Sequence, residues 1–121
     1  MYVYLSSKPS TEYPENTATD FTIQLPRTIS GVQECGVLEV RLPSTPQKPL
    51  FVCTDLCEDS IVNSTSLQVL RRVTLKTVIP SLVTYIPLRL QAFDRIRIYI
   101  IQDSGQLANL GGETTITLHL R

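Results

Sequence analysis

Hydrophobic and polar residues alternate most regularly in two segments near the end of the chain, residues 95–101 and 114–120. Each segment has one apolar and one polar face, which is the period-two pattern of a β-strand with one buried side. Such a strand needs a second layer that buries its apolar face, so we expect two packed sheets. Together with two residues of an earlier strand, the side chains expected to face inward are Phe21, Ile23, Ile96, Ile98, Ile100, Ile116 and Leu118.

Six further segments earlier in the chain combine apolar, β-branched and aromatic residues with turn residues at their ends. They comprise residues 2–5, 20–25, 35–42, 50–54, 66–76 and 82–88. We expect Pro26 to end the second of these strands, because proline cannot donate to a strand ladder. A change of alternation at residues 70–72 predicts a bulge, and Pro87 is expected at an edge or at the end of the pairing.

Eight predicted strands and no helical pattern indicate a β-sandwich or barrel, and the lack of a fixed-period repeat argues against a propeller or solenoid. Among sandwiches, eight strands fit best a jelly roll, in which the first and last strands lie side by side. The twelve-residue link of residues 102–113 is long for a tight hairpin and suits a strand that crosses between sheets. The predicted fold is an all-β, eight-stranded single jelly-roll β-sandwich, with residues 1–121 as one domain.

Composition narrows the range of partners and compartments. The 121 residues are 42% hydrophobic, enough for a core without metal or disulfide support, and 11 basic residues balance 11 acidic ones. A neutral chain lacks the clustered positive charge of a general nucleic-acid binder. No apolar run reaches the ~20 residues needed to cross a bilayer and no signal peptide is evident, so we expect a soluble protein made in the cytosol, without a membrane partner.

Few residues in the chain are suited to catalysis or metal binding. The single histidine, His119, lies on the polar face of the last predicted strand, without partners for a catalytic set. Cys53 and Cys57 have the wrong spacing for a zinc knuckle, and with Cys35 they are expected to be free thiols of a reducing compartment. We therefore expect no enzyme activity, no metal, no cofactor and no small-molecule substrate.

Four stretches of the sequence resemble one protein family. They are YPENTATDFTIQLPRTI, VLEVRLP, FVCTDL and AFDRIRIYIIQDSGQLANLGGETTITLHLR, which together with their surroundings cover about two thirds of the chain. The chain resembles the penton-like minor capsid protein of Polinton (Maverick) elements, adintoviruses and adomaviruses. That family has an FTVxLP motif, a CDL-type strand, and an FDxIxIxIxDxxG segment followed by a strand ending in TLHFR. The matching positions here are residues 21–26, 53–56, 93–105 and 117–121.

The resemblance implies a structural capsid protein. Its members fold as a single jelly roll and assemble as pentamers at icosahedral vertices, beside a double-jelly-roll major capsid protein. We therefore expect a homopentamer in the virion, made in the host cytoplasm. Many relatives carry a long segment where this chain has only residues 44–49, which puts in doubt any activity housed there, such as receptor attachment. The alternative is a cellular β-sandwich module that binds a ligand or protein, and it would run as a monomer or dimer rather than as a ring of five.

A ring requires a heterologous contact, in which one surface patch meets a different patch on the neighbour. One candidate patch is the basic and aromatic face of residues 95–101, formed by Arg95, Arg97 and Tyr99. The other is an acidic stretch without calcium-loop spacing, formed by Asp55, Glu58 and Asp59. These six residues are the candidate subunit interface; in the other interpretation they are separate solvated charges, since exposed ion pairs contribute only ~0–1 kcal/mol.

Overall fold

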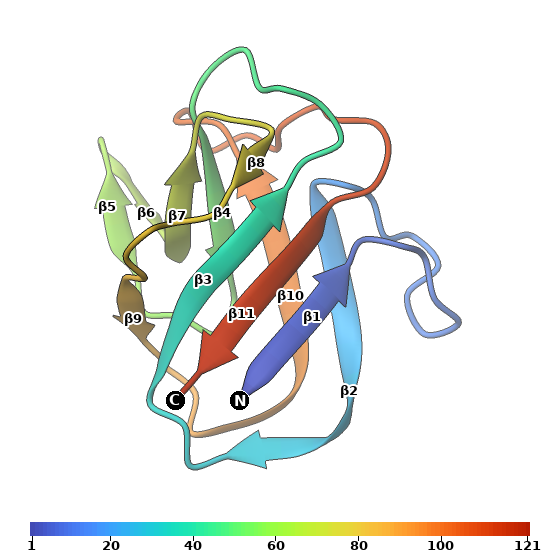
Figure 1. Ribbon diagram of the computed structural model, residues 1–121, viewed down its shortest axis with the longest axis vertical. Coiled ribbons are helices and arrows are strands. Elements are labelled where there is room, and N and C mark those ends of the chain that lie inside the picture. Colours follow the sequence, from blue (N-terminus) through green and yellow to red (C-terminus); the bar gives the residue numbers. More distant parts are fainter.

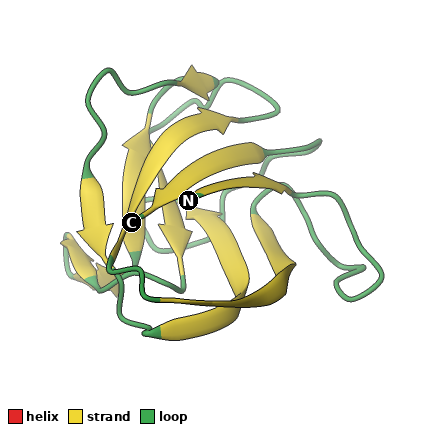
Figure 2. Ribbon diagram, turned by 60° about the horizontal axis from the view of Figure 1, so that its bottom comes forward, coloured by secondary structure: helices red, strands yellow, loops and turns green.

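The structure of the protein, a computed structural model, describes residues 1–121 and consists of strands and loops without a helix (Figure 2). In chain order the strands are β1 (Tyr2–Ser6), β2 (Asp20–Ser30), β3 (Glu34–Arg41), β4 (Leu50–Thr54), β5 (Ser60–Val62), β6 (Thr65–Leu67), β7 (Val69–Val73), β8 (Thr77–Val78), β9 (Tyr85–Pro87), β10 (Ala92–Ile101) and β11 (Thr115–Leu120). The predicted all-β class is confirmed. The chain also has no helix that is long and apolar enough to cross a bilayer.

Two antiparallel sheets form a sandwich-like arrangement (Figure 1). The first, called here the β1 sheet, has the order β1-β11-β3-β8, and β9 also pairs with β3. The second, called here the β2 sheet, has the order β2-β10-β4-β7, while β5 and β6 form a separate hairpin. The first and last strands are paired, as predicted, with Tyr2 opposite His119 and Ser6 opposite Thr115.

The core lies between the inner faces of the two sheets. Of the seven residues predicted to face inward, six are buried: Phe21, Ile96, Ile98, Ile100, Ile116 and Leu118. Ile23 is only partly buried and packs at the margin of this core. Full burial of one such side chain contributes about 1.5–3 kcal/mol, so the alternation of β10 and β11 accounts for much of the stability of the sandwich.

The link between β10 and β11 crosses from the β2 sheet to the β1 sheet, as its length predicts. Its path is held by backbone bonding, with the N–H of Ala108 donating to the carbonyl of Ile100 (2.9 Å). Before β11, the Thr114 hydroxyl donates to the carbonyl of Ala18 (2.7 Å). Gly112 has a φ of 105°, and a Cβ atom there would lie 2.8 Å from Cβ of Pro43, so only glycine fits this turn without strain.

The prediction that Pro26 ends its strand is wrong, because β2 continues to Ser30. Gln24 lies opposite Arg95 and Ile29 opposite Phe93, so residues 25–28 face a single residue of β10. Pro26 falls within this bulge, where the ladder is already interrupted and a missing N–H costs no strand hydrogen bond.

The chain has eleven strands rather than the predicted eight. The expected strand of residues 66–76 is divided between β6 and β7 and ends at Val73, and β8 follows it at residues 77–78. The expected strand of residues 82–88 is reduced to β9, which ends at Pro87 as expected. The predicted bulge is confirmed at Leu70, since Val52 pairs with Arg71 and Cys53 with Val69. Asn63 turns the β5–β6 hairpin with a φ of 53°, a conformation that asparagine tolerates better than most residues.

Candidate functional site

The predicted basic and aromatic patch lies on the outer face of the β2 sheet, where Arg95 and Arg97 are exposed and Tyr99 is half-buried. The Arg97 guanidinium donates from Nε and Nη2 to the two carboxylate oxygens of Asp20, at 3.0 Å each. It also lies 4.7 Å from the centre of the Tyr99 ring. The hydrogen bond to Asp20 raises the pKa of Arg97, so this cation is held within its own chain.

The acidic stretch lies beside this patch in the same chain. The backbone N–H of Arg97 donates to Oδ1 of Asp55 (3.1 Å), and the N–H of Asp55 donates to the carbonyl of Arg97 (3.3 Å). Glu58 and Asp59 are exposed, and Asp59 accepts a hydrogen bond from Ser66 (3.0 Å). The structure thus brings Asp55 and Arg97 together intramolecularly.

The other members of the candidate interface remain available for an external contact. The ion pairs of the chain join Arg41 to Glu39, Arg97 to Asp20 and Arg121 to Glu34. Arg95, Asp55, Glu58 and Asp59 are therefore in no ion pair, and of these Asp55 already accepts the backbone N–H of Arg97. The expected contact between neighbouring subunits stays a prediction, and Arg95, Glu58 and Asp59 are the charges with most capacity left to make it.

The three cysteines are buried free thiols. Burial raises the pKa of Cys53 to about 12. A hydrogen bond with Cys57, followed by burial, raises the pKa of Cys35 far above its ordinary range. Because the thiolate is the reactive form, neither Cys35 nor Cys53 is an activated nucleophile at neutral pH. No group of three or more His, Cys, Asp or Glu side chains lies together as a metal site.

His119 is half-buried within an aromatic cluster on the outer face of the β1 sheet. Its Nδ1 shares a 2.7 Å hydrogen bond with the hydroxyl of Tyr85, and its ring stacks on Tyr2 at 4.8 Å between centres. The Arg121 guanidinium lies 3.5 Å from the centre of the Tyr85 ring. The cluster links side chains of β1, β11 and β9 and so stabilises the sheet. The position of His119 in the sequence does not by itself predict this role.

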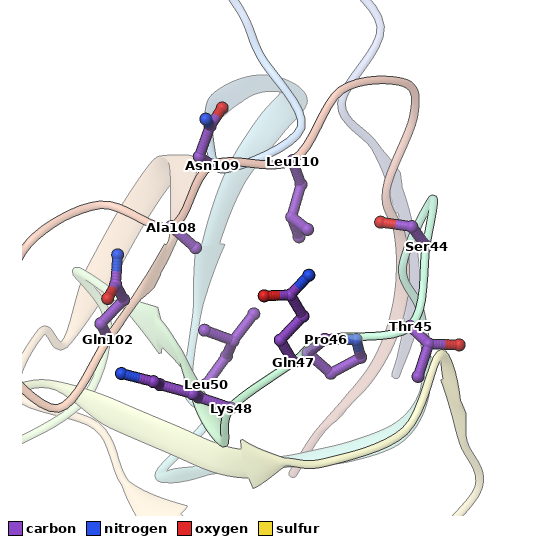
Figure 3. A pocket seen from close by; sticks show the side chains of 10 residues that line it. All are labelled: Ser44, Thr45, Pro46, Gln47, Lys48, Leu50, Gln102, Ala108, Asn109 and Leu110. Carbon is purple, nitrogen blue, oxygen red and sulfur yellow. The ribbon is translucent and has the colours of Figure 1, made fainter.

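An open cavity of about 440 Å³ lies at one end of the sandwich, between the β3–β4 and β10–β11 connections (Figure 3). Leu50, Ala108 and Leu110 are its apolar residues. The amide of Gln47 extends toward Leu110, and Lys48 runs along the opposite wall (Figure 3). These groups can make hydrogen bonds and charge contacts to a polar ligand. The sequence did not predict this cavity, because it arises only where two distant connections meet.

The outward groups of the two C-terminal strands lie on opposite sides of the molecule. Tyr99 and its basic neighbours belong to the β2 sheet, and His119 belongs to the β1 sheet. Both surfaces carry aromatic rings, hydrogen-bonding groups and charged groups. These groups can make noncovalent contacts with another molecule. No protein-family model and no curated protein matches this chain.

Proposed function

We propose that this chain is a structural capsid protein, a penton-like minor capsid subunit that forms homopentamers at icosahedral vertices beside a double-jelly-roll major capsid protein. In this proposal the chain folds as an eight-stranded single jelly roll, is part of the virion, and acts by assembly rather than by catalysis. Its partners are further copies of itself and the major capsid protein.

The strand order is the observation that carries the proposal. Strands β8 and β9 both pair with β3, so they count as one interrupted strand, and the β5–β6 hairpin counts as an insertion between β4 and β7. The eight strands that remain are divided equally between two sheets, with the first and last strands adjacent. A jelly roll has eight strands in two sheets, which is the reason that this order favours it.

The position of the family-like stretches supports the same proposal. Residues 93–105 include most of β10, and residues 117–121 include most of β11. Strand β10 lies between β2 and β4, and β11 lies between β1 and β3. These two C-terminal stretches therefore lie mostly on interior strands of the two sheets, where a change affects the pairing on both sides, rather than on loops whose similarity has little bearing on the fold.

Assembly state tests the proposal. The purified chain should have the mass of five copies by light scattering and native mass spectrometry, and should appear as a closed ring in electron micrographs. Closure would also cover strand edges that a lone sandwich exposes. A chain that remains single at high concentration contradicts the vertex role.

The end cavity favours the second candidate function, a β-sandwich module that binds a ligand. Its volume of about 440 Å³ falls within the ~300–1,000 Å³ of typical ligand pockets. Amide, hydroxyl and ammonium groups on its walls suit a polar ligand. A monomeric chain whose melting temperature rises with a polar ligand, and falls back in a Lys48→Ala variant, would favour this function over the capsid role.

A further inference from the structure

Exposed large apolar side chains are concentrated at the two opposite edges of the β1 sheet. There are eight such side chains in the chain, and six of them lie at these edges: Met1, Tyr2, Tyr4, Leu75, Ile79 and Leu82. The first three belong to the β1 side and the last three flank β8, at opposite sides of the sheet order (Figure 1). Contiguous exposed apolar patches on a folded protein mark contact surfaces, whereas scattered single residues do not.

The β1 edge combines protruding aromatic rings with a recess. Tyr2 and Tyr4 are 61% and 77% exposed. Beside them, a groove of about 400 Å³ runs between β1 and β2, with walls that include Val3, Leu5, Ile23, Leu25 and Ile29. Arg27 is the only charged side chain along this groove. The β1 edge can therefore receive apolar side chains that project from another surface.

The β8 edge projects apolar side chains of that kind. Leu75, Ile79 and Leu82 are 61%, 64% and 81% exposed and lie within one short segment of the chain. Lys76 is the only charged residue between Leu75 and Leu82. Pro80 directly follows Ile79, and β8 itself has only two residues, so this edge offers side chains rather than a long ladder of free backbone groups.

We infer that the β8 edge of one copy of this chain packs into the groove and tyrosines of the β1 edge of the next copy. The inference rests on the proposed ring and adds the surfaces that close it. Because the two patches differ and lie on opposite edges, their contact is heterologous and repeats head to tail, as a ring requires.

The available area is of the size that such a contact needs. An aromatic side chain covers ~150–250 Å² when buried, so Tyr2 and Tyr4 at their exposures offer about 300 Å². A stable interface buries ~800 Å² per partner, with an apolar core and a polar rim. The two tyrosines would thus supply more than a third of one side, before the groove walls are counted.

Two variants test the contact, because each removes one of its two surfaces. Tyr4→Asp places a charge on the β1 edge, and Leu82→Asp places one on the β8 edge. Both positions are highly exposed, so both variants should keep the circular dichroism spectrum and melting temperature of the wild type. Leu107→Asp is the matched control, since Leu107 is 48% exposed on the β10–β11 link and belongs to neither edge.

At a concentration where the wild type has the mass of five chains, each edge variant should have the mass of one chain, and Leu107→Asp should remain a ring. An equimolar mixture of the two edge variants should form a species of two chains and grow no further, because each retains one intact surface. If either edge variant still forms the ring, the proposed contact is overturned. The pentamer itself would then be formed through other surfaces of the chain. If the wild type itself is a single chain, both the contact and the vertex role are overturned.

Discussion

On the outer face of the β2 sheet, the Arg97 guanidinium is bound by Asp20 and packed on Tyr99, whereas Tyr4 and Leu82 at the edges of the β1 sheet are mostly exposed to solvent. The difference indicates which surface would gain more free energy from contact with a neighbouring subunit. A new ion pair at Arg97 would replace an existing one, and exposed pairs contribute only ~0–1 kcal/mol. Burial of apolar surface contributes about 25 cal/mol per Å², so a few hundred Å² at the edges outweighs one exchanged ion pair.

The largest effect should come from breaking the sheet beneath the charged face. Ile98 lies between Arg97 and Tyr99 on β10 but points inward and is fully buried. Ile98→Asp would bury a charge without a partner, and we expect a loss of more than about 4 kcal/mol, enough to prevent folding. Thermal unfolding followed by circular dichroism checks this. A melting temperature equal to that of the wild type would mean that the inward register of β10 is wrong.

Alkaline pH should weaken the same sheet through Cys53, which lies opposite Tyr99. Burial raises the pKa of Cys53 from 9.0 to about 12. Above pH 9 the unfolded thiol loses its proton while the folded one keeps it, so the stabilising contribution is complete below pH 9 and is lost as the pH rises toward 12. The expected loss is about 1.4 kcal/mol per pH unit. Denaturant unfolding at several pH values gives the free energy of unfolding as a function of pH. Between pH 9 and 12 this free energy should fall less steeply for Cys53→Ala than for the wild type. An equally steep fall in both would contradict the burial of this thiol.

A substitution at Gly36 should disturb the β1 sheet where β3 pairs with β9. A Cβ atom at Gly36 would lie 2.5 Å from Cγ1 of Val83 and 3.0 Å from the Tyr85 ring. We expect Gly36→Val to cost about 1–3 kcal/mol, because the covering segment must move. Gly111→Val is the control, since a Cβ atom at Gly111 meets nothing within 4 Å. Equal unfolding free energies for the two variants would show that the segment over Gly36 yields without cost.

The smallest effect is expected at Arg97 itself. Arg97→Glu removes the pair with Asp20 and places a third carboxylate beside Asp20 and Asp55, so it should lower the stability of the single chain by about 1 kcal/mol or less. The mass of the assembly should stay that of the wild type at low and high salt. Arg95→Glu, outside any ion pair, is the matched variant. A salt-dependent loss of the ring in Arg97→Glu would instead support the charged contact expected from the sequence.

Sequence reasoning succeeded where one physical signal dominated. The alternation of β10 and β11 identified the buried residues, because a strand with one buried face has a strict period of two. The prediction that Pro26 ends its strand was wrong because proline is excluded only from positions that pair with a neighbouring strand. Whether Pro26 is paired depends on the bulge in β2, which is set by the alignment of β2 with β10. The β5–β6 hairpin was missed for a related reason: three-residue strands such as β5 carry too few residues to show a period.

The candidate site was harder to predict, because its contacts join residues distant along the chain. The outward direction of Arg97 followed from alternation, but its partner Asp20 lies on a different strand and is adjacent only once β2 pairs with β10. The same holds for Tyr2 and His119, at opposite ends of the chain. Patterns within a segment predict which way a side chain points, and the sheet order decides what it meets.

The central claim is that copies of this chain close into a ring of five through apolar edges. Light scattering of the purified wild-type protein, over a range of concentrations and at low and high salt, tests it most directly. The mass should be that of five chains and should change little with salt, since the two edge patches carry almost no charge. The mass of a single chain at every concentration would contradict the account, and a ring that dissociates at high salt would contradict its apolar interface.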